Sequence, residues 1–305
     1  MNKHFLPAVA VLVIVFCQLT SAQYCYGSRT IDPIVSTEWL DAHRSDAGII
    51  LIDVRTPDKY AAGHIPMATS VPVTQWWVIR DELLLELPED EDLRNLIGGS
   101  GIDASSRVVL IGATDSDYER ADCSRVGFTL IYGGIHNVAL LDGGMNKWTA
   151  EERESTEEPY TAPAVVYSGS FNKRIAVSKH YVAWHLWGSA TIVDARVPGD
   201  FFGVNPLEFS EREGHIFRAV NLPTPWIFTT DGTFRPVEEL GKMAWNVVGP
   251  NPFKRVIVYC GVGGYAATWW YMLSEVLGYK KVRMYDGSIQ EWSKDPDAPM
   301  QRFRW

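Results

Sequence analysis

The chain lacks any cluster of basic residues, and the Asn-x-Ser/Thr sequon is absent from it altogether. Its 28 lysine and arginine residues stand against 37 aspartate and glutamate residues, which gives a formal charge of −9. An acidic chain without a basic patch is a poor ligand for nucleic acid or an anionic membrane surface, so neither is expected as a partner. The missing sequon means that glycosylation gives no support for a eukaryotic secretory route.

Long apolar runs are also missing, except near the N-terminus. There, Lys3 and His4 precede an apolar run over 8–16, and small residues follow at 20–22. This order predicts a signal peptide over 1–22 and export to a bacterial periplasm. The apolar run is shorter than the roughly 20 residues of a membrane-spanning helix, which makes an uncleaved anchor the less favoured alternative. No membrane insertion is expected once the signal is removed.

Cysteine is scarce, with 4 residues in the whole chain. Cleavage of the signal peptide would leave Cys25, Cys123 and Cys260. An odd number of cysteines in an exported protein indicates at least one free thiol. Cys25 and Cys123 could form a disulfide and leave Cys260 free, but the sequence alone leaves this pairing open.

Three segments occur twice in the chain, in the same order and at similar spacings. They are LIDVRTP (51–57) and IVDARVP (192–198), AGHIPMATSVP (62–72) and EGHIFRAVNLP (213–223), and ALLDGGMNKW (139–148) and RMYDGSIQEW (283–292). One module therefore occurs in tandem, over 23–150 and 169–305. An acidic segment with two prolines, 151–168, reads as the linker between the two copies.

Short apolar strands alternate with helical stretches in each module. In the second, strands are expected over 191–196, 256–260 and 280–286, with a helix over 267–279 between the last two. Such alternation predicts an α/β module with a parallel sheet covered by helices on both faces. Functional groups of these sheets lie at the carboxyl ends of strands, and Cys260 is the last residue of its strand.

The residues after Cys260 allow two interpretations. Gly261, Gly263 and Ala266 match the G-x-G-x-x-A fingerprint of dinucleotide-binding proteins, with Asp286 suitably placed for a ribose hydroxyl. Too few residues follow Asp286 to complete a nucleotide-binding half sheet, and this aspartate already belongs to the repeated segment. A dinucleotide site is therefore disfavoured.

The alternative is that the loop stabilises a charged sulfur. Backbone N–H groups of a glycine-rich loop that opens a helix can converge on one point and form an anion site. A thiolate is the reactive form of cysteine, and its pKa, near ~8.5 when free, falls at a helix N-terminus. We therefore expect Cys260 to be a catalytic nucleophile, with a buried, inert cysteine as the alternative. The loop residues expected to bind substrate are Gly261, Val262, Gly263, Gly264, Tyr265 and Ala266.

Both modules resemble rhodanese domains, and the chain resembles a tandem-rhodanese sulfurtransferase. The resemblance is carried by Asp-x-Arg at 53–55 and 194–196, Gly-His-Ile at 63–65 and 214–216, the repeated Asp-Gly-x-x-x-x-Trp segments at 142–148 and 286–292, and Cys260. It implies that Cys260 takes a sulfane sulfur from a donor, holds it as a persulfide and passes it to a thiol, cyanide or protein acceptor. Gly112 aligns with Cys260, so the first module lacks the nucleophile. No cofactor is expected.

The chain departs from the rhodanese pattern at two places. Rhodanese loops commonly read C-x-x-G-x-R, and here Tyr265 stands at the arginine position. Asp200 stands where long members carry a second arginine. Each lost arginine would weaken thiosulfate binding roughly tenfold to a hundredfold, which favours a polysulfide or a persulfide as donor. Related phosphatases close a longer loop with an arginine at the position of Ala266, so phosphatase activity is disfavoured.

Arg196 and Trp226 complete the candidate substrate-binding residues, Trp226 as part of the pocket entrance. An aspartate and an arginine at a strand end more often brace a loop, so a structural role for Arg196 is the favoured alternative. His64 and His215 occur in both modules, which indicates a structural role. No histidines show the spacing of metal ligands, and no metal site is expected.

A sulfur carrier without turnover, docking onto a sulfur-metabolism complex, is the alternative function. It is suggested by Tyr265 and Asp200, because their presence weakens anion binding at the loop. A redox thiol protein is less favoured, since the chain has no C-x-x-C motif.

Overall fold

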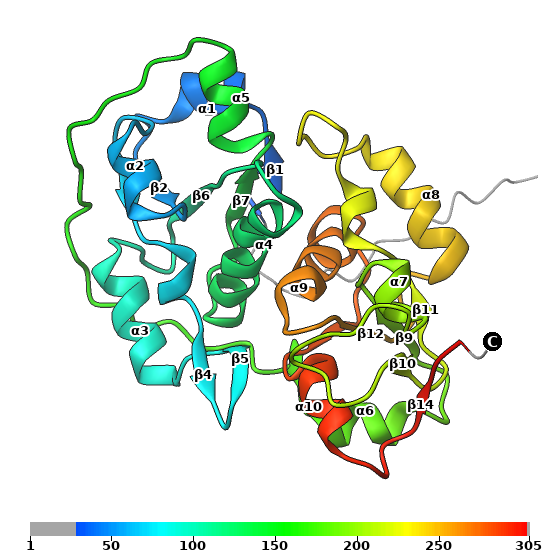
Figure 1. The fold of residues 1–305 in the computed structure, drawn as a ribbon. Helices are drawn as coiled ribbons and strands as arrows, with labels where there is room; N and C mark the ends of the chain where they lie inside the picture. The colour runs from blue at the N-terminus through cyan, green and yellow to red at the C-terminus, as the bar shows by residue number, and fades with distance from the viewer. Residues whose placement is uncertain (1–28, 304–305) are drawn as a thin grey trace, which may run out of the picture.

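The structure, a computed structural model, describes residues 29–303. The predicted signal peptide and Cys25 lie outside these residues, and so does the possible pairing of Cys25 with Cys123. Two sheets of five strands lie side by side, each with helices around it (Figure 1). The expected α/β class, with two modules that each contain a parallel sheet, is confirmed.

The first sheet has the strand order β1-β7-β6-β2-β3, and all its pairings are parallel. Its strands are β1 (Ile34–Val35), β2 (Ile49–Asp53), β3 (Ala68–Ser70), β6 (Arg107–Ile111) and β7 (Val138–Leu141). The helices of this module are α1 (Thr37–His43), α2 (Pro57–Ala61), the 3-10 helix η1 (Val73–Gln75), α3 (Asp90–Gly99), α4 (Asp117–Tyr132) and α5 (Gly144–Ala150). A hairpin of β4 (Val78–Arg80) and β5 (Leu83–Glu86) extends from it.

The second sheet has the equivalent order β8-β13-β12-β9-β11, again parallel throughout. Its strands are β8 (Ala176–Val177), β9 (Thr191–Asp194), β11 (Val220–Asn221), β12 (Val256–Tyr259) and β13 (Val282–Tyr285). Its helices are α6 (Lys179–His185), α7 (Pro198–Phe201), the 3-10 helix η2 (Thr224–Ile227), α8 (Val237–Val247), α9 (Gly264–Tyr271) and α10 (Ser288–Lys294), and a π-helical turn over Met272–Val276 extends α9. A small antiparallel pair joins β10 (His215–Ile216) to β14 (Met300–Gln301).

The strands are apolar on both faces because each sheet is covered on both sides. In the first module, Leu51, Val109 and Ala139 pack against α1 and α5. Neighbouring residues such as Leu110 and Leu140 point to the other face, toward α3 and α4. Successive strand residues alternate between two separate cores, as the twofold period of a strand requires.

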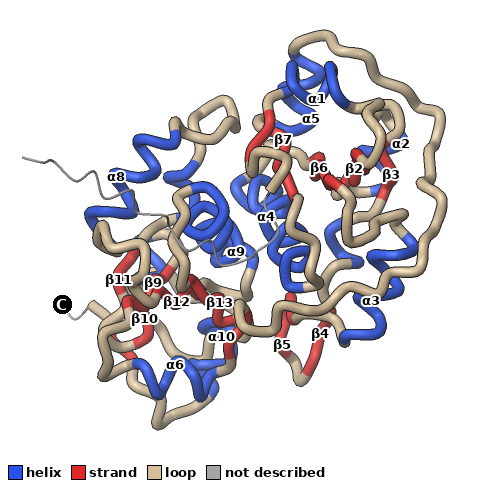
Figure 2. Tube along the Cα trace, turned by 180° about the vertical axis from the view of Figure 1, so that it is seen from behind, coloured by secondary structure: helices blue, strands red, loops and turns tan. Residues whose placement is uncertain are grey.

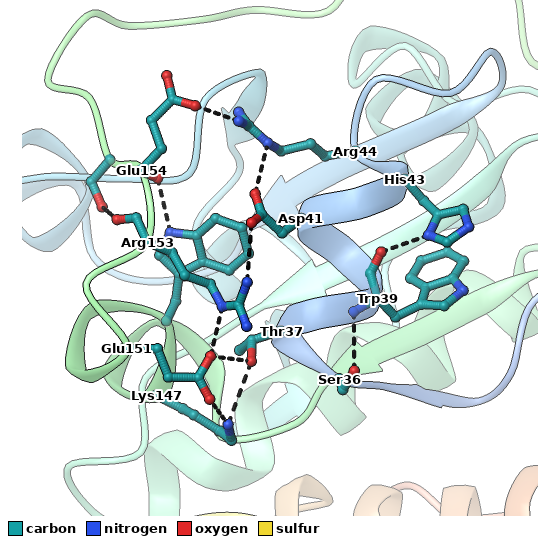
Figure 3. Close-up of polar contacts among 12 residues, drawn as sticks. Ser36, Thr37, Trp39, Asp41, His43, Arg44, Lys147, Glu151, Arg153 and Glu154 are labelled. Atoms are coloured by element: carbon teal, nitrogen blue, oxygen red, sulfur yellow. Dashed lines mark hydrogen bonds and ion pairs between the residues drawn. The ribbon is translucent and has the colours of Figure 1, made fainter.

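A polar network fastens α1 to α5 and to the start of the linker (Figure 3). Ser36 caps α1 by accepting a hydrogen bond from the Trp39 N–H at 3.0 Å. Arg153 donates to Asp41 at 3.0 Å and to Glu151 at 2.6 Å. The first and last helices of the module are thereby held together.

The segment 151–168 runs along the outside of the first module (Figure 1, Figure 2). The backbones of His64 and Thr156 exchange two hydrogen bonds of 2.9 Å, and Val165 donates to Gly98 O at 2.9 Å. The linker is therefore bound to the first module over much of its length before the chain enters the second.

Helices α4 and α9 lie between the two sheets and form the centre of the contact between the modules (Figure 1). Phe128 meets Trp270 edge to face, with ring centroids 4.8 Å apart. Trp269 and Trp270 are fully buried and belong to the core. One apolar cluster joins both modules through this pair of helices. None of the helices between residues 29 and 303 combines the length and apolar character that a membrane-spanning helix needs.

Candidate functional site

Cys260 follows β12 directly, at the carboxyl end of the central strand of its sheet. The neighbouring strand β9 ends alongside it at Asp194, which pairs with Tyr259. The side chain is almost completely buried, with 3% of its surface exposed. The sequence-based placement of this cysteine at a strand end and before a helix is correct.

The loop after Cys260 directs backbone amides at the sulfur. The N–H of Gly263 donates to Sγ at 3.1 Å, and the amides of Val262 and Ala266 also hydrogen-bond to it. Gly263 has a φ of +102°, a conformation that side-chain-bearing residues rarely adopt. The expected convergence of amides on one point is therefore present, at the start of α9.

The expected low pKa of the thiol is wrong for the resting protein. Burial raises the pKa of Cys260, and the hydrogen bonds from Ala266, Gly263 and Val262 oppose this without overcoming it. Removing a charged sulfur from water costs more than these amides return. The resting residue is a neutral thiol at pH 7, with donors already in place for negative charge on the sulfur.

The backbone of the loop is held from the side of α10. Ser288 Oγ accepts a hydrogen bond from the Cys260 N–H at 3.2 Å. The N–H groups of Ile289 and Gln290 donate to the carbonyls of Cys260 and Gly261 at 3.1 and 3.2 Å. The repeated Asp-Gly-x-x-x-x-Trp segment, which contains these residues, thus supports the loop as well as the core.

Aromatic residues surround the loop on its other sides. A Cβ atom on Gly261 would lie 2.8 Å from the ring of Phe209, so a side chain there would displace this ring. The ring of Tyr265 stacks on that of Tyr118, which comes from α4 of the first module, at 5.4 Å. Burial raises the pKa of the Tyr265 hydroxyl, so this side chain is neutral at pH 7. Cys-Gly-Val-Gly-Gly-Tyr therefore offers a substrate amides and rings, without a positive charge.

Arg196 is engaged in a structural bracket. Its Nε donates to Asp194 at 2.9 Å, and its Nη2 donates to Asp194 and to the carbonyl of Gly214, the latter at 2.8 Å. Arg55 makes the same contacts with Asp53 and Gly63 in the module that has no nucleophile. The duplication favours the structural role that was the alternative for Arg196.

The histidines of the repeated segments also serve the framework. His215 stacks on Phe201 at 3.7 Å and bonds the carbonyl of that residue, and His64 stacks on Tyr60 at the same distance. Neither lies in contact with the cysteine loop, and the same arrangement occurs in both modules. Their interpretation as structural residues is confirmed.

Trp226 and Asp200 lie outside the immediate surroundings of the sulfur. Trp226 is 52% exposed on η2, the helix whose Thr224 hydroxyl donates to the carbonyl of Tyr265 at 2.9 Å. Asp200 accepts a hydrogen bond from Asn205 at 2.9 Å. η2 therefore touches the loop through Thr224, and Trp226 presents its side chain to solvent beyond it.

The equivalent position of the first module is closed. A Cβ atom on Gly112 would lie 2.6 Å from Sγ of Cys123, so this sulfur fills the space of the missing side chain. Cys123 is a free, buried thiol, and burial raises its pKa well above the ordinary value. In contrast to Cys260, no backbone amide is among the groups that lower the pKa of Cys123 within residues 29–303, so Cys123 is the less reactive thiol.

Arg125 is a residue that sequence reasoning missed. It lies on α4 of the first module, and its Nη1 donates to Asp286 of the second at 2.7 Å. A Cβ atom on Gly263 would lie 3.1 Å from this same nitrogen, so the guanidinium abuts the cysteine loop. No local pattern marks Arg125, because its partners are far away in the sequence.

Comparison with known proteins agrees with this geometry. The family model described as Rhodanese-like domain matches residues 36–151 and 178–295. A thiosulfate sulfurtransferase of Corynebacterium glutamicum is 32% identical over 281 residues, which cover 88% of this chain and 90% of that protein. The sulfur carrier protein TtuD of Thermus thermophilus is 28% identical over 282 residues, covering 88% of this chain and 96% of its own.

A solved structure with the same fold is the anaerobic ergothioneine biosynthesis enzyme of Chlorobium limicola in complex with trimethyl histidine. It superposes with a TM-score of 0.78 at 21% identity, over 89% of this chain and 70% of that chain. At this identity the likeness concerns the fold alone. The chain belongs to the rhodanese-like family, as a member with two such domains in tandem, and the sulfurtransferase class expected from its sequence is confirmed.

Proposed function

We propose that Cys260 is the nucleophile of this sulfurtransferase and carries the transferred sulfur as a persulfide. The observation that carries the proposal is the convergence of three backbone amides, from Val262, Gly263 and Ala266, on its Sγ atom. Amides in this arrangement stabilise negative charge that develops on sulfur, and their benefit grows as the charge develops. The neutral resting thiol loses its proton as the donor reacts, and the proton passes to the leaving group.

The proposed reaction has two displacement steps. The Cys260 thiolate attacks the sulfane sulfur of the donor, an S–S bond to Sγ forms, and the donor's own bond to that sulfur breaks with the electron pair going to the leaving group. The acceptor thiolate or cyanide then attacks the outer sulfur, and Sγ leaves with the electron pair. Sulfur oxidation states balance over the cycle, and no cofactor takes part.

A polysulfide or a persulfide is the donor that the site favours. The loop has Tyr265 in place of an arginine, and the guanidinium of Arg196 is tied to Asp194 and Gly214. A doubly charged anion such as thiosulfate would meet amides without a cation to pair with. Thiosulfate is the substrate named for the relative from Corynebacterium glutamicum, so the two donors must be compared directly.

Export to a periplasm is proposed on the sequence of residues 1–22 alone. In such a compartment, small sulfur compounds and the thiol of a partner protein are both accessible as substrates. We propose further that the module over 23–150 serves the other as a structural partner, because its Gly112 replaces the nucleophile and Cys123 fills the space.

The proposal is tested by mass spectrometry and turnover. Purified protein incubated with inorganic polysulfide should gain the mass of one sulfur atom on the peptide that contains Cys260, and cyanide should remove it. Cys260→Ser should gain none and lose turnover by at least about a thousandfold, since the nucleophile is gone. Cys123→Ser, a change at the buried thiol of the first module, is the matched control and should retain both. An active Cys260→Ser protein would refute the assignment.

A sulfur carrier is the second candidate function, favoured by the relative named sulfur carrier protein in Thermus thermophilus. A carrier accepts one sulfur and releases it only to a specific partner. Multiple turnovers with small donor and acceptor, faster than the uncatalysed exchange between them, would establish the enzyme. A single sulfur loaded without further turnover would establish the carrier.

A further inference from the structure

The module without a nucleophile reaches the cysteine loop with a buried arginine. Arg125 is 1% exposed on α4, and its Nη1 donates to Asp286 at 2.7 Å. Its Nη2 donates to the carbonyl of Leu85, in the β4–β5 hairpin. The guanidinium therefore connects three segments: α4, the hairpin, and the start of the Asp-Gly-x-x-x-x-Trp segment.

The same guanidinium lies directly against Gly263. A Cβ atom there would be 3.1 Å from Nη1 of Arg125 and 3.4 Å from Oδ1 of Asp286. Gly263 is the residue whose N–H donates to Sγ of Cys260, and its φ of +102° is a conformation that residues with a side chain rarely adopt. The ion pair of Arg125 and Asp286 thus packs against Gly263, the residue whose amide faces the sulfur.

The β4–β5 hairpin is strained at Leu85, the residue that contacts Arg125. Leu85 has a φ of +57°, a left-handed conformation that costs a non-glycine residue on the order of 1 kcal/mol. Its carbonyl binds Arg125, and its side chain lies 3.7 Å from the Cβ position of Gly264 at the start of α9. A residue keeps such a strained conformation only where its neighbours hold it there. The neighbours of Leu85 named here, Arg125 and Gly264, are also neighbours or members of the cysteine loop.

Stability alone explains the buried ion pair poorly. Nε of Arg125 is buried without a hydrogen-bond partner in the structure as described. Desolvation of two charges offsets much of their attraction, and apolar replacements of buried ion pairs are often neutral or stabilising. An arginine kept here with an unsatisfied nitrogen is better explained by what it positions.

The first module supplies an internal comparison. Asp142 is the counterpart of Asp286 in the repeated segment, and it too accepts an amide from the other module, that of Phe234 at 2.8 Å. Within residues 29–303, however, Asp142 has no ion-pair partner. The arginine is present only at the copy of the motif that lies beside a nucleophilic cysteine.

We infer that Arg125 is a positioning residue for the Cys260 loop: held by Asp286 and Leu85, it fixes Gly263 so that its amide faces the sulfur. The inference rests on the proposed role of Cys260. Because Arg125 and Asp286 neutralise each other, the effect is one of geometry. The module that lost its nucleophile is thereby a component of the active site of the other.

The test compares Arg125→Met with Arg29→Met in the full chain. Arg29 also pairs across the modules, with Glu275 at 2.8 Å, but that pair involves no residue of the loop. The readouts are the pH dependence of Cys260 alkylation by iodoacetamide, followed on its peptide by mass spectrometry, and kcat and KM with polysulfide. Urea unfolding reports the stability of each variant.

Arg125→Met should raise the apparent pKa of Cys260 by about one unit and lower kcat on the order of tenfold, with KM unchanged. Arg29→Met should lose stability but leave both values at those of the wild type. If Arg125→Met does not fold, Arg125→Lys and Asp286→Asn replace it in the test. Both should shift the thiol pKa and kcat in the same direction as expected for Arg125→Met. Equal thiol pKa and kcat in Arg125 and Arg29 variants would overturn the inference. Alkylation of Cys260 does not depend on sulfur transfer, so it tests the positioning by itself. If Arg125→Met shifts the thiol pKa but Cys260→Ser remains active, the positioning role of Arg125 stands and only the proposed function is rejected.

Discussion

A single side chain, Tyr265, sets the charge of the site. In the rhodanese pattern an arginine stands at this place, and here a ring stacked on Tyr118 fills it. The hydroxyl stays neutral because burial raises its pKa. The sulfur therefore faces amides and aromatic rings, an environment suited to donors that carry little charge on the sulfur to be transferred.

Tyr265→Arg should change the choice of donor. A guanidinium at this position would pair with the sulfonate oxygens of thiosulfate, a contact worth roughly 1.5–3 kcal/mol. We expect kcat/KM for thiosulfate to rise roughly tenfold to a hundredfold while kcat/KM for polysulfide changes little. Steady-state assays with both donors measure this, and Tyr265→Phe, which keeps the ring and adds no charge, is the control. A rise with both donors, or with neither, would show that charge at this position does not select the donor.

Single residues also show how far the sequence could be read. The position of Cys260, after a strand and before a glycine loop, could be predicted because both features are local. The direction of its pKa was predicted wrongly, since the sequence shows the amides but not the burial that outweighs them. Arg125 was missed because its contacts with Asp286 and Leu85 depend on how the two modules dock.

The β4–β5 hairpin is a small element, and it connects the first module to the second. The side chain of Gln290, on α10, makes two hydrogen bonds to the backbone of Leu84, of 2.9 and 2.8 Å. The N–H of Leu87, just after the hairpin, donates to Asp286 at 2.9 Å. The hairpin of the first module is thereby joined to the segment that supports the cysteine loop of the second.

The hairpin carries a buried carboxyl group, that of Glu86. Burial, and after it the nearby Asp286, raise the pKa of Glu86 to about 8, although Arg125 and Arg80 oppose this. One of its oxygens, Oε1, has no hydrogen-bond partner. Glu86 is thus protonated in the folded protein at pH 7 and ionised in the unfolded chain. Unfolding releases a proton, so the stability that the protonated group contributes below pH 4.5 is lost as pH rises to about 8.

Glu86→Gln should remove this loss, because the amide resembles the protonated acid at every pH. The variant should gain on the wild type as pH rises from 5 to 9, reaching on the order of 2 kcal/mol after allowance for solvent screening. Urea unfolding at several pH values measures the difference. Glu82→Gln is the control, since Glu82 lies in the same hairpin with its side chain 93% exposed. A Glu86→Gln advantage that does not depend on pH would contradict the titration.

Elements were predictable where the chain repeats itself. The duplicated segments correctly placed β9, β12 and β13 and their counterparts, because the hydrophobic pattern of a parallel strand is determined locally. The hairpin has no counterpart in the repeated segments. Its turn is formed by Asp81 and Glu82, both with a positive φ angle, so no glycine marks the turn in the sequence. The hairpin contacts Gln290, which lies 206 positions after Leu84, so no local pattern predicts this contact.

At the scale of the whole molecule, the two modules exchange equivalent contacts. The motif aspartate of each accepts an amide from the other: Asp286 from Leu87, and Asp142 from Phe234. Tyr118 and Tyr265, each at the start of the helix that follows its strand, stack on each other. The duplicated sequence thus forms a contact with approximate twofold symmetry, within which the second module has the proposed nucleophile, with Arg125 beside its loop.

Because one apolar cluster runs through α4 and α9, the modules should unfold as a single cooperative unit. The Tyr271 hydroxyl lies 2.9 Å from the carbonyl of Pro33 and 2.6 Å from that of Val138, both in the other module. Tyr271→Phe leaves buried carbonyls without this donor and should cost about 1–3 kcal/mol. Tyr279→Phe removes a comparable bond, of 2.6 Å to Gly249, inside the second module.

Calorimetry of the two variants distinguishes a shared core from two modules that merely touch. In a single cooperative unit, both substitutions lower the temperature of one transition whose calorimetric and van't Hoff enthalpies agree. In independent modules, Tyr279→Phe would move the transition of the second module alone and leave a separate peak for the first. One transition in both variants would mean that the module with the cysteine loop does not unfold independently of its partner, because the helix that begins at the loop is also the centre of the common core.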